Sequence, residues 1–295
     1  MSDHTEHSPD FNPSSSTANI SGTLGIIAGG GALPERLLAA CDRREIETFV
    51  IGFEGQTTAG LMAGRRHLWT RLGAAGQIIQ TLKAHQIQHL VLIGSITRPA
   101  FSELKPDWKT ASFLLRVGSR ALGDNNLLTA IKDELEKEGF TVHGVQEFAE
   151  DLLAPLGPVG KYKPQSGDKH DIERGLSVAR SVGKLDVGQA TVIQEGLVLG
   201  VEAIEGTDAL IDRCGDLKRG GKGPILVKTQ KPQQDITLDL PTIGPETIQR
   251  AAYHGYSGIV FEAGRTLLID PQTVAEKADE AKMFVIGIDP SETFE

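Results

Sequence analysis

Short apolar runs alternate with helix-like segments along the first half of the chain, and this alternation limits the possible folds more than any other feature. The first run, Leu24–Ala28, passes through three glycines into a helix-like segment over 33–44. Strands are also expected over 48–52, 89–94 and 141–144, and helices over 76–85, 113–119 and 126–138. Such alternation is typical of a parallel sheet covered by helices, so the first half is predicted to be an α/β domain.

The second half follows a different pattern. Residues 154–166 carry three prolines and two glycines without periodicity, which predicts a linker. Beyond it, β-rich runs over 190–193 and 197–203 flank a turn-like Gln194–Gly196, which predicts a hairpin. Further strands are expected over 225–227, 258–262, 266–269 and 283–287, and helices over 171–181, 245–254 and 271–281. We therefore expect an N-terminal Rossmann-like domain over 22–153 and a C-terminal mixed α/β domain over 167–295.

Composition narrows the classes of function. With 295 residues, two domains are the natural expectation. A net charge of −9 argues against nonspecific attraction to nucleic acid or to anionic lipid, so a phosphate ligand would need a local site. No apolar run approaches the ~20 residues of a membrane-spanning helix.

The cysteines and the N-terminus point to a cytoplasmic protein. Cys41 and Cys214 have no metal-ligand spacing and are expected to be small buried residues in a reducing compartment. Residues 1–21 are polar and lack a positively charged segment followed by an apolar one. We therefore expect a disordered tail there and no signal peptide.

The glycine-rich loop is a candidate phosphate site. Gly29–Gly31 follow a strand and precede a helix, so backbone amides and the positive end of the helix would meet there. The dinucleotide fingerprint would require glycine or alanine where Pro34 stands, although Glu54 could serve as the acidic residue that holds a ribose. The loop alone leaves three interpretations open: another phosphate ligand, a dinucleotide, or a structural turn.

Two later loops are candidates for the same edge of the sheet. The segment Gly94–Pro99 (GSITRP) follows a buried strand, and ligands of open parallel sheets bind at the carboxyl ends of the strands. Arg98 could bind a phosphate through its guanidinium or could pair with a surface carboxylate. Asp124 and Asn125 precede a helix, where a helix cap and a ligand contact are both reasonable roles.

Carboxylates and lysines gather in two segments of the second half. Residues 202–208 (EAIEGTD) end a strand and open a helix, and residues 228–244 contain Lys228, Lys231, Asp235 and Asp239. Enzymes that hydrolyse polyphosphates commonly use Mg²⁺ held by one or two carboxylates, together with a positioned water. The alternative is a polar loop whose charges are simply solvated.

Several motifs, taken together, resemble one bacterial family. The segments IAGGGALP, GSITRP, DVGQATVIQEGLVLGVEAIEGTD, KPQQDITLDLPTIG and GIVFEAG resemble the UDP-2,3-diacylglucosamine pyrophosphatases of the LpxI type, from Leu24 to Asp289. The resemblance implies a Mg²⁺-dependent hydrolase of lipid A biosynthesis with two domains. It would cleave the diphosphate of UDP-2,3-diacylglucosamine to UMP and 2,3-diacylglucosamine 1-phosphate (lipid X), with the lipid-bearing ligand between the domains.

The resemblance also implies roles for individual residues. The essential aspartate of the family's DLPTIG motif corresponds to Asp239, which we expect to position Mg²⁺ with help from Asp208 or Glu205. Lys231 and Arg98 would offset charge on the phosphoryl oxygens. The expected substrate contacts are Gly30, Gly31, Ala32, Ser95, Arg98, Asp124, Gln189 and Thr207. The chain departs from its relatives at GSITRP, where a GNVSRP-like loop is usual, and at Gly123–Asn125, where Gly-Asp-Asp is common.

Two other classes of function remain as alternatives. One is a nicotinamide-dependent oxidoreductase that uses the glycine loop, against which stand Pro34 and the lack of a hydride-transfer pair. The other is a noncatalytic carrier of a nucleotide sugar or lipid. For the hydrolase, the amphiphilic UDP-sugar lipid leads us to expect an apolar cleft between the domains and transient contact with the inner membrane surface, with no nucleic acid partner.

Overall fold

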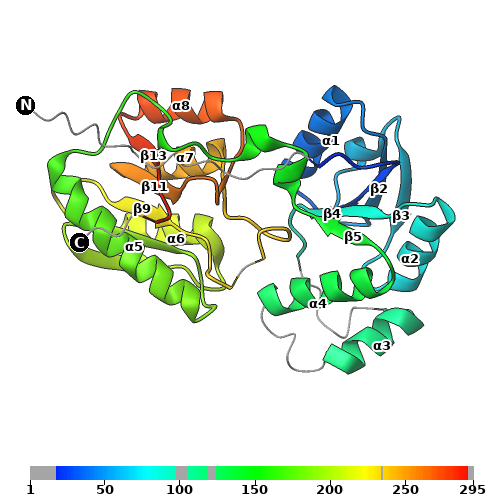
Figure 1. Ribbon diagram of the computed structural model, residues 1–295. Coiled ribbons are helices and arrows are strands. Elements are labelled where there is room, and N and C mark those ends of the chain that lie inside the picture. The colour runs from blue at the N-terminus through cyan, green and yellow to red at the C-terminus, as the bar shows by residue number, and fades with distance from the viewer. Residues whose placement is uncertain (1–17, 98–104, 118–123, 234, 292–295) are drawn as a thin grey trace, which may run out of the picture.

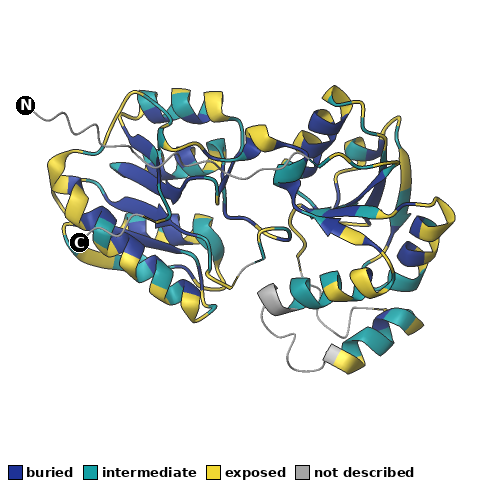
Figure 2. Cartoon of the chain, in the orientation of Figure 1, coloured by how far each residue is buried: buried dark blue, intermediate teal, exposed yellow. Residues whose placement is uncertain are grey.

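The computed structural model describes residues 18–97, 105–117, 124–233 and 235–291. These residues form two large sheets, each flanked by helices, and one two-stranded sheet (Figure 1). The predicted fold class, a parallel α/β domain followed by a mixed α/β domain, is confirmed. Figure 2 shows the strands of both sheets largely buried, while the helices alternate between buried and exposed faces. Among the described residues, none of the helices has the length and apolarity needed to cross a membrane.

The N-terminal sheet has five parallel strands in the order β3-β2-β1-β4-β5, a Rossmann-like arrangement. The strands are β1 (Leu24–Ala28), β2 (Thr48–Phe53), β3 (Arg66–Thr70), β4 (His89–Ile93) and β5 (Thr141–His143). The helices are α1 (Leu33–Arg43), α2 (Ala75–Ala84), α3 (Trp108–Val117) and α4 (Asp124–Lys137), with 3₁₀ turns η1 (Ala59–Met62), η3 (Val145–Glu147) and η4 (Glu150–Leu152). The loops after β1, β2 and β4 therefore share one edge.

Two elements of this domain differ from the predictions. Strand β3 was not expected, because Arg66 and His67 at its start are exposed and no continuous apolar run marks it. Helix α3 begins at Trp108, five positions before the expected start. Asp107 causes this earlier start, since its Oδ1 accepts a hydrogen bond of 2.8 Å from the Thr110 amide.

The C-terminal sheet is mixed, with the order β6-β13-β11-β9-β7-β8. Strands β9 (Ile225–Lys228), β11 (Gly258–Glu262) and β13 (Phe284–Ile288) are parallel, whereas β6 (Gly157–Pro158), β7 (Ala190–Gln194) and β8 (Leu197–Val201) pair antiparallel, and β7 and β8 form the predicted hairpin. A small parallel pair joins β10 (Thr242–Ile243) to β12 (Leu267–Leu268). The helices are α5 (Lys169–Lys184), α6 (Gly206–Asp216), α7 (Pro245–Tyr253) and α8 (Pro271–Glu280), with the 3₁₀ turn η5 (Ser166–Asp168).

The segment 154–166 does more than connect the two domains. Strand β6 pairs with β13, and Ala154 and Val159 pack into the C-terminal core, so part of the expected linker belongs to the second sheet. A two-residue strand that contains proline at a sheet edge leaves little sequence signal. The exact domain boundaries stay a prediction. Residues 1–17 of the expected tail lie outside the described residues, whereas the amide of Ala18 donates to the Glu147 carbonyl.

The segment 235–241, between β9 and β10, crosses from the C-terminal domain to the N-terminal one (Figure 1). Leu238 packs into the core between the N-terminal sheet and α2 and α4, and Leu240 packs into the core on the α1 side of the same sheet. Lys132 of α4 also bonds Asp235 at 2.6 Å. Because Leu238 and Leu240 lie on opposite faces of the N-terminal sheet, this segment holds the two domains together.

We expect Leu240→Ala to lower the free energy of unfolding by about 2–4 kcal/mol, because it leaves a cavity in a core shared by both domains. Urea denaturation followed by circular dichroism measures this difference. Leu217→Ala is the matched control, since Leu217 is 52% exposed and should change the stability by less than about 0.5 kcal/mol. Equal effects of the two variants would contradict the described packing of Leu240.

The ion pair between Lys132 and Asp235 predicts a dependence of stability on pH. Burial raises the pKa of the Asp235 carboxyl, but hydrogen bonds from Lys132 and Thr237 outweigh it and hold the pKa below its usual 3.8. The pair therefore stabilises the fold above that pH and loses its effect as the pH falls through the lowered folded-state pKa. Asp235→Asn should be less stable than wild type at pH 7, and the difference should shrink below about pH 4, measured by thermal unfolding across pH. A constant difference would exclude this linkage.

Candidate functional site

The glycine loop after β1 packs tightly against the loop after β4. The Gly30 amide donates to the Ser95 carbonyl at 2.7 Å, and the Ser95 amide donates back to the Gly30 carbonyl at 3.0 Å. A Cβ atom on Gly29 would lie 2.4 Å from the Ser95 carbonyl oxygen, and one on Gly30 would lie 2.8 Å from that of Gln56. These two glycines therefore allow the backbones to cross closely. The Gly30 amide, expected to contact substrate, is already used within the protein.

Gly31 and Ala32 are the open part of this loop. Gly31 has a φ of +86°, both residues are exposed, and Ala32 caps α1 without a side-chain hydrogen bond. The first amides of a helix have no partners within the helix, so they can bind an anion. The Ser95 side chain faces them, with Oγ 3.9 Å from where a Cβ atom of Gly31 would stand. The structure thus brings together three of the predicted contacts.

Gln56, which the sequence analysis did not single out, joins a third loop to this edge. Its side chain accepts a hydrogen bond of 2.9 Å from the Thr97 amide, which ties the loop after β2 to the loop after β4. Glu54 is exposed at the end of β2. Arg98 lies outside the described residues, and Asp124 begins α4 without a described side chain.

Lys228, at the end of β9, is the centre of a charged cluster in the C-terminal domain. Only 6% of the residue is exposed, and its Nζ donates a hydrogen bond of 2.9 Å to the Thr242 carbonyl. Burial lowers the pKa of its ammonium group, whereas the nearby carboxylates of Glu202, Asp239 and Asp208 act in the opposite direction. Three carboxylates from separate parts of the chain thus lie within electrostatic range of the ammonium group.

Glu202 connects two of the predicted substrate contacts. Glu202 is 5% exposed. Its carboxylate accepts a hydrogen bond of 2.5 Å from the Thr207 hydroxyl and another of 2.9 Å from the backbone N–H of Gln189. Gln189 Oε1 is buried and has no hydrogen-bond partner among the described residues. A buried carboxylate at the end of β8 thus orients Thr207 at the start of α6. The only sequence signal for Glu202 was its place in the EAIEGTD corner.

Asp239 lies between the two leucines that anchor the crossing segment. Leu238 and Leu240 are buried, whereas Asp239 is exposed, and Gln146 after β5 donates to the Ile236 carbonyl at 3.3 Å. Asp239 therefore lies where the chain crosses from one face of the N-terminal sheet to the other. Its charge also influences Lys228 of the C-terminal domain. Leu240 belongs to the same hydrophobic cluster as Leu33 of α1, which follows the glycine loop.

The other predicted charged residues have partners of their own. Asp208 is exposed, and its Oδ2 lies 3.6 Å from Arg250 Nε. Glu205 pairs with Arg213 at 2.7 Å. Lys231, the expected catalytic lysine, pairs with Asp186 at 2.9 Å, next to the C-terminal end of α5. Lys228, the other lysine of this segment, is influenced by the charges of Asp239 and Asp208.

The arrangement of the carboxylates can be compared with what a magnesium site needs. Within the described ranges, no group of three or more His, Cys, Asp or Glu side chains is arranged to hold a metal ion. Asp239 and Asp208 are exposed carboxylates that both influence Lys228 through their charge, so they lie in the same region of the molecule. This fits Mg²⁺, which commonly takes one or two carboxylates and completes its shell with water and substrate phosphates. Glu205 fits less well, because Arg213 already neutralises it.

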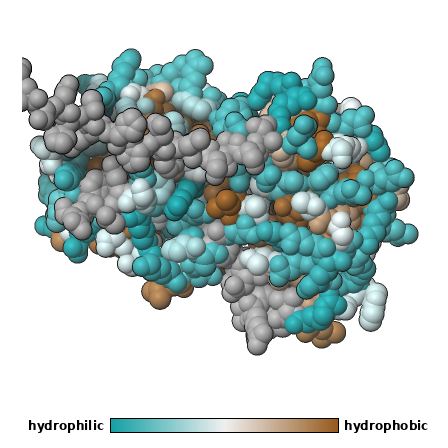
Figure 3. Space-filling model, in the orientation of Figure 1, coloured by the Kyte–Doolittle hydropathy of each residue, from teal (hydrophilic) through white to brown (hydrophobic). Residues whose placement is uncertain are grey.

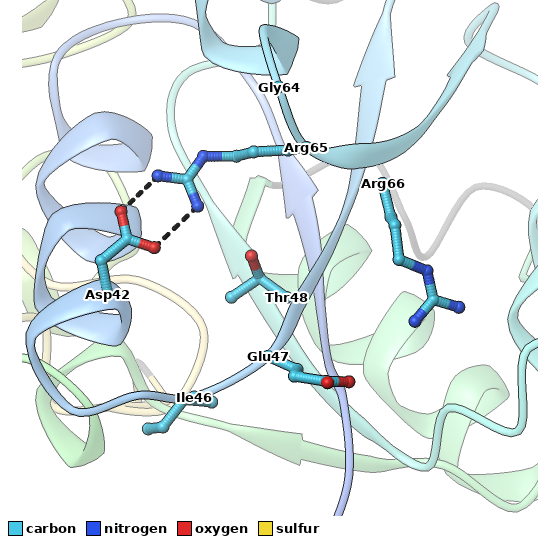
Figure 4. Close-up of a pocket in the computed structure, with 7 residues that line it drawn as sticks. All are labelled: Asp42, Ile46, Glu47, Thr48, Gly64, Arg65 and Arg66. Carbon is cyan, nitrogen blue, oxygen red and sulfur yellow. Dashed lines mark hydrogen bonds and ion pairs between the residues drawn. The ribbon is translucent and has the colours of Figure 1, made fainter.

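A pocket of about 280 Å³ lies at the other edge of the N-terminal sheet (Figure 4). Thr48 and Arg66, which begin β2 and β3, line it, and the Arg65 guanidinium binds both carboxylate oxygens of Asp42. This pocket is polar and opens away from the glycine loop. The expected apolar cleft between the domains stays a prediction.

Comparisons with known proteins cover both domains. The LpxI N-terminal domain model matches residues 23–152, and the LpxI C-terminal domain model matches residues 155–286. A relative from Caulobacter vibrioides, named UDP-2,3-diacylglucosamine pyrophosphatase LpxI, is 41% identical over 279 residues, which cover 91% of this chain and 98% of the relative.

A solved structure, the Bordetella bronchiseptica enzyme WbmG in complex with NAD, is 17% identical, with a TM-score of 0.26 over 41% of this chain and 36% of that one. This likeness is too weak to bear on the fold or on a ligand. The domain models and the Caulobacter relative together account for nearly the whole chain from residue 23 to residue 286. The chain belongs to the LpxI family.

Proposed function

We propose that this protein is a UDP-2,3-diacylglucosamine pyrophosphatase of lipid A biosynthesis, which hydrolyses its substrate to UMP and 2,3-diacylglucosamine 1-phosphate. The observation that carries the proposal is the 41% identity to the Caulobacter relative of that name, over 98% of the relative's length. Two features fit a diphosphate ligand: Asp239 is exposed in the crossing segment, and the exposed Gly31 and Ala32 stand at the N-terminus of α1, where anions can bind.

In the proposed reaction, Asp239 would orient the attacking water and, with Asp208, would hold Mg²⁺. When bound, Mg²⁺ would offset the charge of the diphosphate oxygens. The open amides of Gly31 and Ala32 would bind a phosphate or a sugar hydroxyl, and Ser95 would contact the same group. Thr207, held in place by Glu202, would contact the substrate from the C-terminal domain.

The acyl chains require apolar surface near these groups. Exposed isoleucines flank three of the site segments: Ile96 beside Ser95, Ile204 between Glu202 and Thr207, and Ile236 before Asp239, exposed by 42%, 104% and 53%. Figure 3 shows apolar side chains at the middle of one face, between the two domains. The proposed amphiphilic ligand and transient membrane contact would use these isoleucines, because apolar side chains next to polar site residues suit acyl chains.

The oxidoreductase alternative receives little support from this geometry. The amide of Gly30 is engaged by Ser95, and Pro34 is buried against the loop after β4, with its Cγ 2.9 Å from where a Cβ atom of Gly94 would stand. A glycine loop packed in this way has less free backbone for a pyrophosphate bridge. A noncatalytic carrier would use the same contacts without hydrolysis, so an assay separates it from the enzyme.

The first experiment measures UMP after the purified protein is incubated with UDP-2,3-diacylglucosamine and Mg²⁺, with and without a chelator. We expect UMP to form only with the metal present, and to form much more slowly from UDP-glucosamine without acyl chains. UMP that forms equally with chelator present would contradict the metal requirement. No UMP under any condition, with the substrate bound, would favour the carrier.

Asp239→Ala should bind the substrate but turn it over at least ~10²-fold more slowly, because it removes a central electrostatic group of the reaction. Steady-state kinetics gives kcat, and calorimetric titration gives the affinity. Asp216→Ala is the control, since Asp216 is exposed at the far end of α6 and should leave kcat unchanged. Near wild-type turnover by Asp239→Ala would reject the role of this residue.

A further inference from the structure

Lys228 is a buried cation where four segments of the chain meet. Its ammonium group donates a hydrogen bond to the Thr242 carbonyl of β10. It also interacts through charge with Glu202 after β8, Asp208 in α6 and Asp239 in the crossing segment. Lys228 itself is 6% exposed, so its ammonium group depends on partners within the protein. Neither the motif resemblance nor the proposed reaction gives Lys228 a role.

The charges explain why a cation is needed here. Three carboxylates influence Lys228 through their charge, one of them buried (Glu202) and two exposed (Asp208 and Asp239), and like charges that are near one another repel. Glu202 has the greatest need of a partner, because it is 5% exposed and a buried charge without a counter-ion is unstable. The Lys228 ammonium is the positive charge that offsets the negative charges of Glu202, Asp208 and Asp239 at this position.

The hydrogen bond to Thr242 adds a mechanical link. Thr242 follows Asp239 by three residues, so the 2.9 Å bond from Lys228 Nζ fixes the chain just beyond the aspartate. Glu202 in turn holds the Thr207 hydroxyl. Through these contacts, one side chain at the end of β9 sets the position of Asp239 and of the Thr207 corner relative to each other.

We propose that Lys228 is a positioning residue, which acts by holding Asp239 and the Glu202–Thr207 corner in the arrangement required for hydrolysis. The proposal rests on the proposed function of the site. It differs from a purely structural role, since a residue that acts through Asp239 should matter only while Asp239 is present.

The test is a double-mutant cycle that uses Lys228→Met, Asp239→Ala and the double variant in the full-length protein. We expect Lys228→Met to lower kcat about 10²-fold. We also expect the double variant to be no slower than Asp239→Ala by more than about threefold, because the two residues act as one unit. Losses that multiply, or a kcat of Lys228→Met within threefold of wild type, would overturn the proposal.

Lys222→Met is the matched control. Lys222 pairs with the buried Asp168 before the start of β9, whereas Lys228 lies at the other end of the same strand. This variant tests the loss of a lysine paired with a buried carboxylate at a distance from Asp239, and it should keep kcat near the wild-type value. Thermal unfolding of each variant establishes that it folds.

If Lys228→Met does not fold, Lys228→Arg takes its place in the cycle. It keeps the charge but moves it, and we expect kcat to fall about tenfold, again only while Asp239 is present. A wild-type kcat in Lys228→Arg would overturn the proposal, since the position of the charge would then not matter.

A readout independent of activity separates this proposal from the proposed function. Hydrogen exchange of the peptide over 235–243 should be faster in the Lys228 variant than in wild type and in Lys222→Met, because the bond to Thr242 is lost. Unchanged exchange would overturn the link whether or not the protein hydrolyses the substrate. Wild-type protein that forms no UMP but shows the faster exchange in the variant would reject only the proposed function.

Discussion

The burial of Leu238 and Leu240 in the N-terminal core is the interaction on which the rest of the arrangement depends. The two leucines are separated by one residue and lie on opposite faces of the N-terminal sheet, so the residue between them must pass over the ends of the strands. That residue is Asp239. Hydrophobic burial, which has no directional chemistry of its own, thus places the carboxylate proposed to be central to the reaction.

Charged side chains add to the hydrophobic contacts between the two domains. Arg36 with Asp270 and Lys132 with Asp235 join the domains by ion pairs, but these pairs are partly exposed and contribute modestly. The cluster around Lys228 is different, because Lys228 and Glu202 are both buried and water cannot readily solvate their charges. Geometry is therefore enforced most strictly where the carboxylates meet, and more loosely at the surface between the domains.

Much of the fold could be predicted from the sequence, because buried parallel strands such as Leu24–Ala28 and His89–Ile93 are continuous apolar runs. Strand β3 and strand β6 could not, since one is an exposed edge strand and the other is two residues long. For the site, the motifs indicated Gly31, Ala32, Thr207 and Asp239. They could not show that the Gly30 amide is occupied, or that the buried Lys228 is influenced by the charges of Glu202, Asp208 and Asp239, because both facts depend on the proximity of distant segments.

The one-residue spacing between Leu238 and Leu240 also limits how this family can vary in length. An added residue in this stretch would let only one leucine reach its core, and the carboxylate would turn away from the strand ends. The number of residues in this stretch must therefore match the distance between the two faces of the neighbouring sheet. We expect homologues to tolerate substitutions in this stretch, but not insertions or deletions.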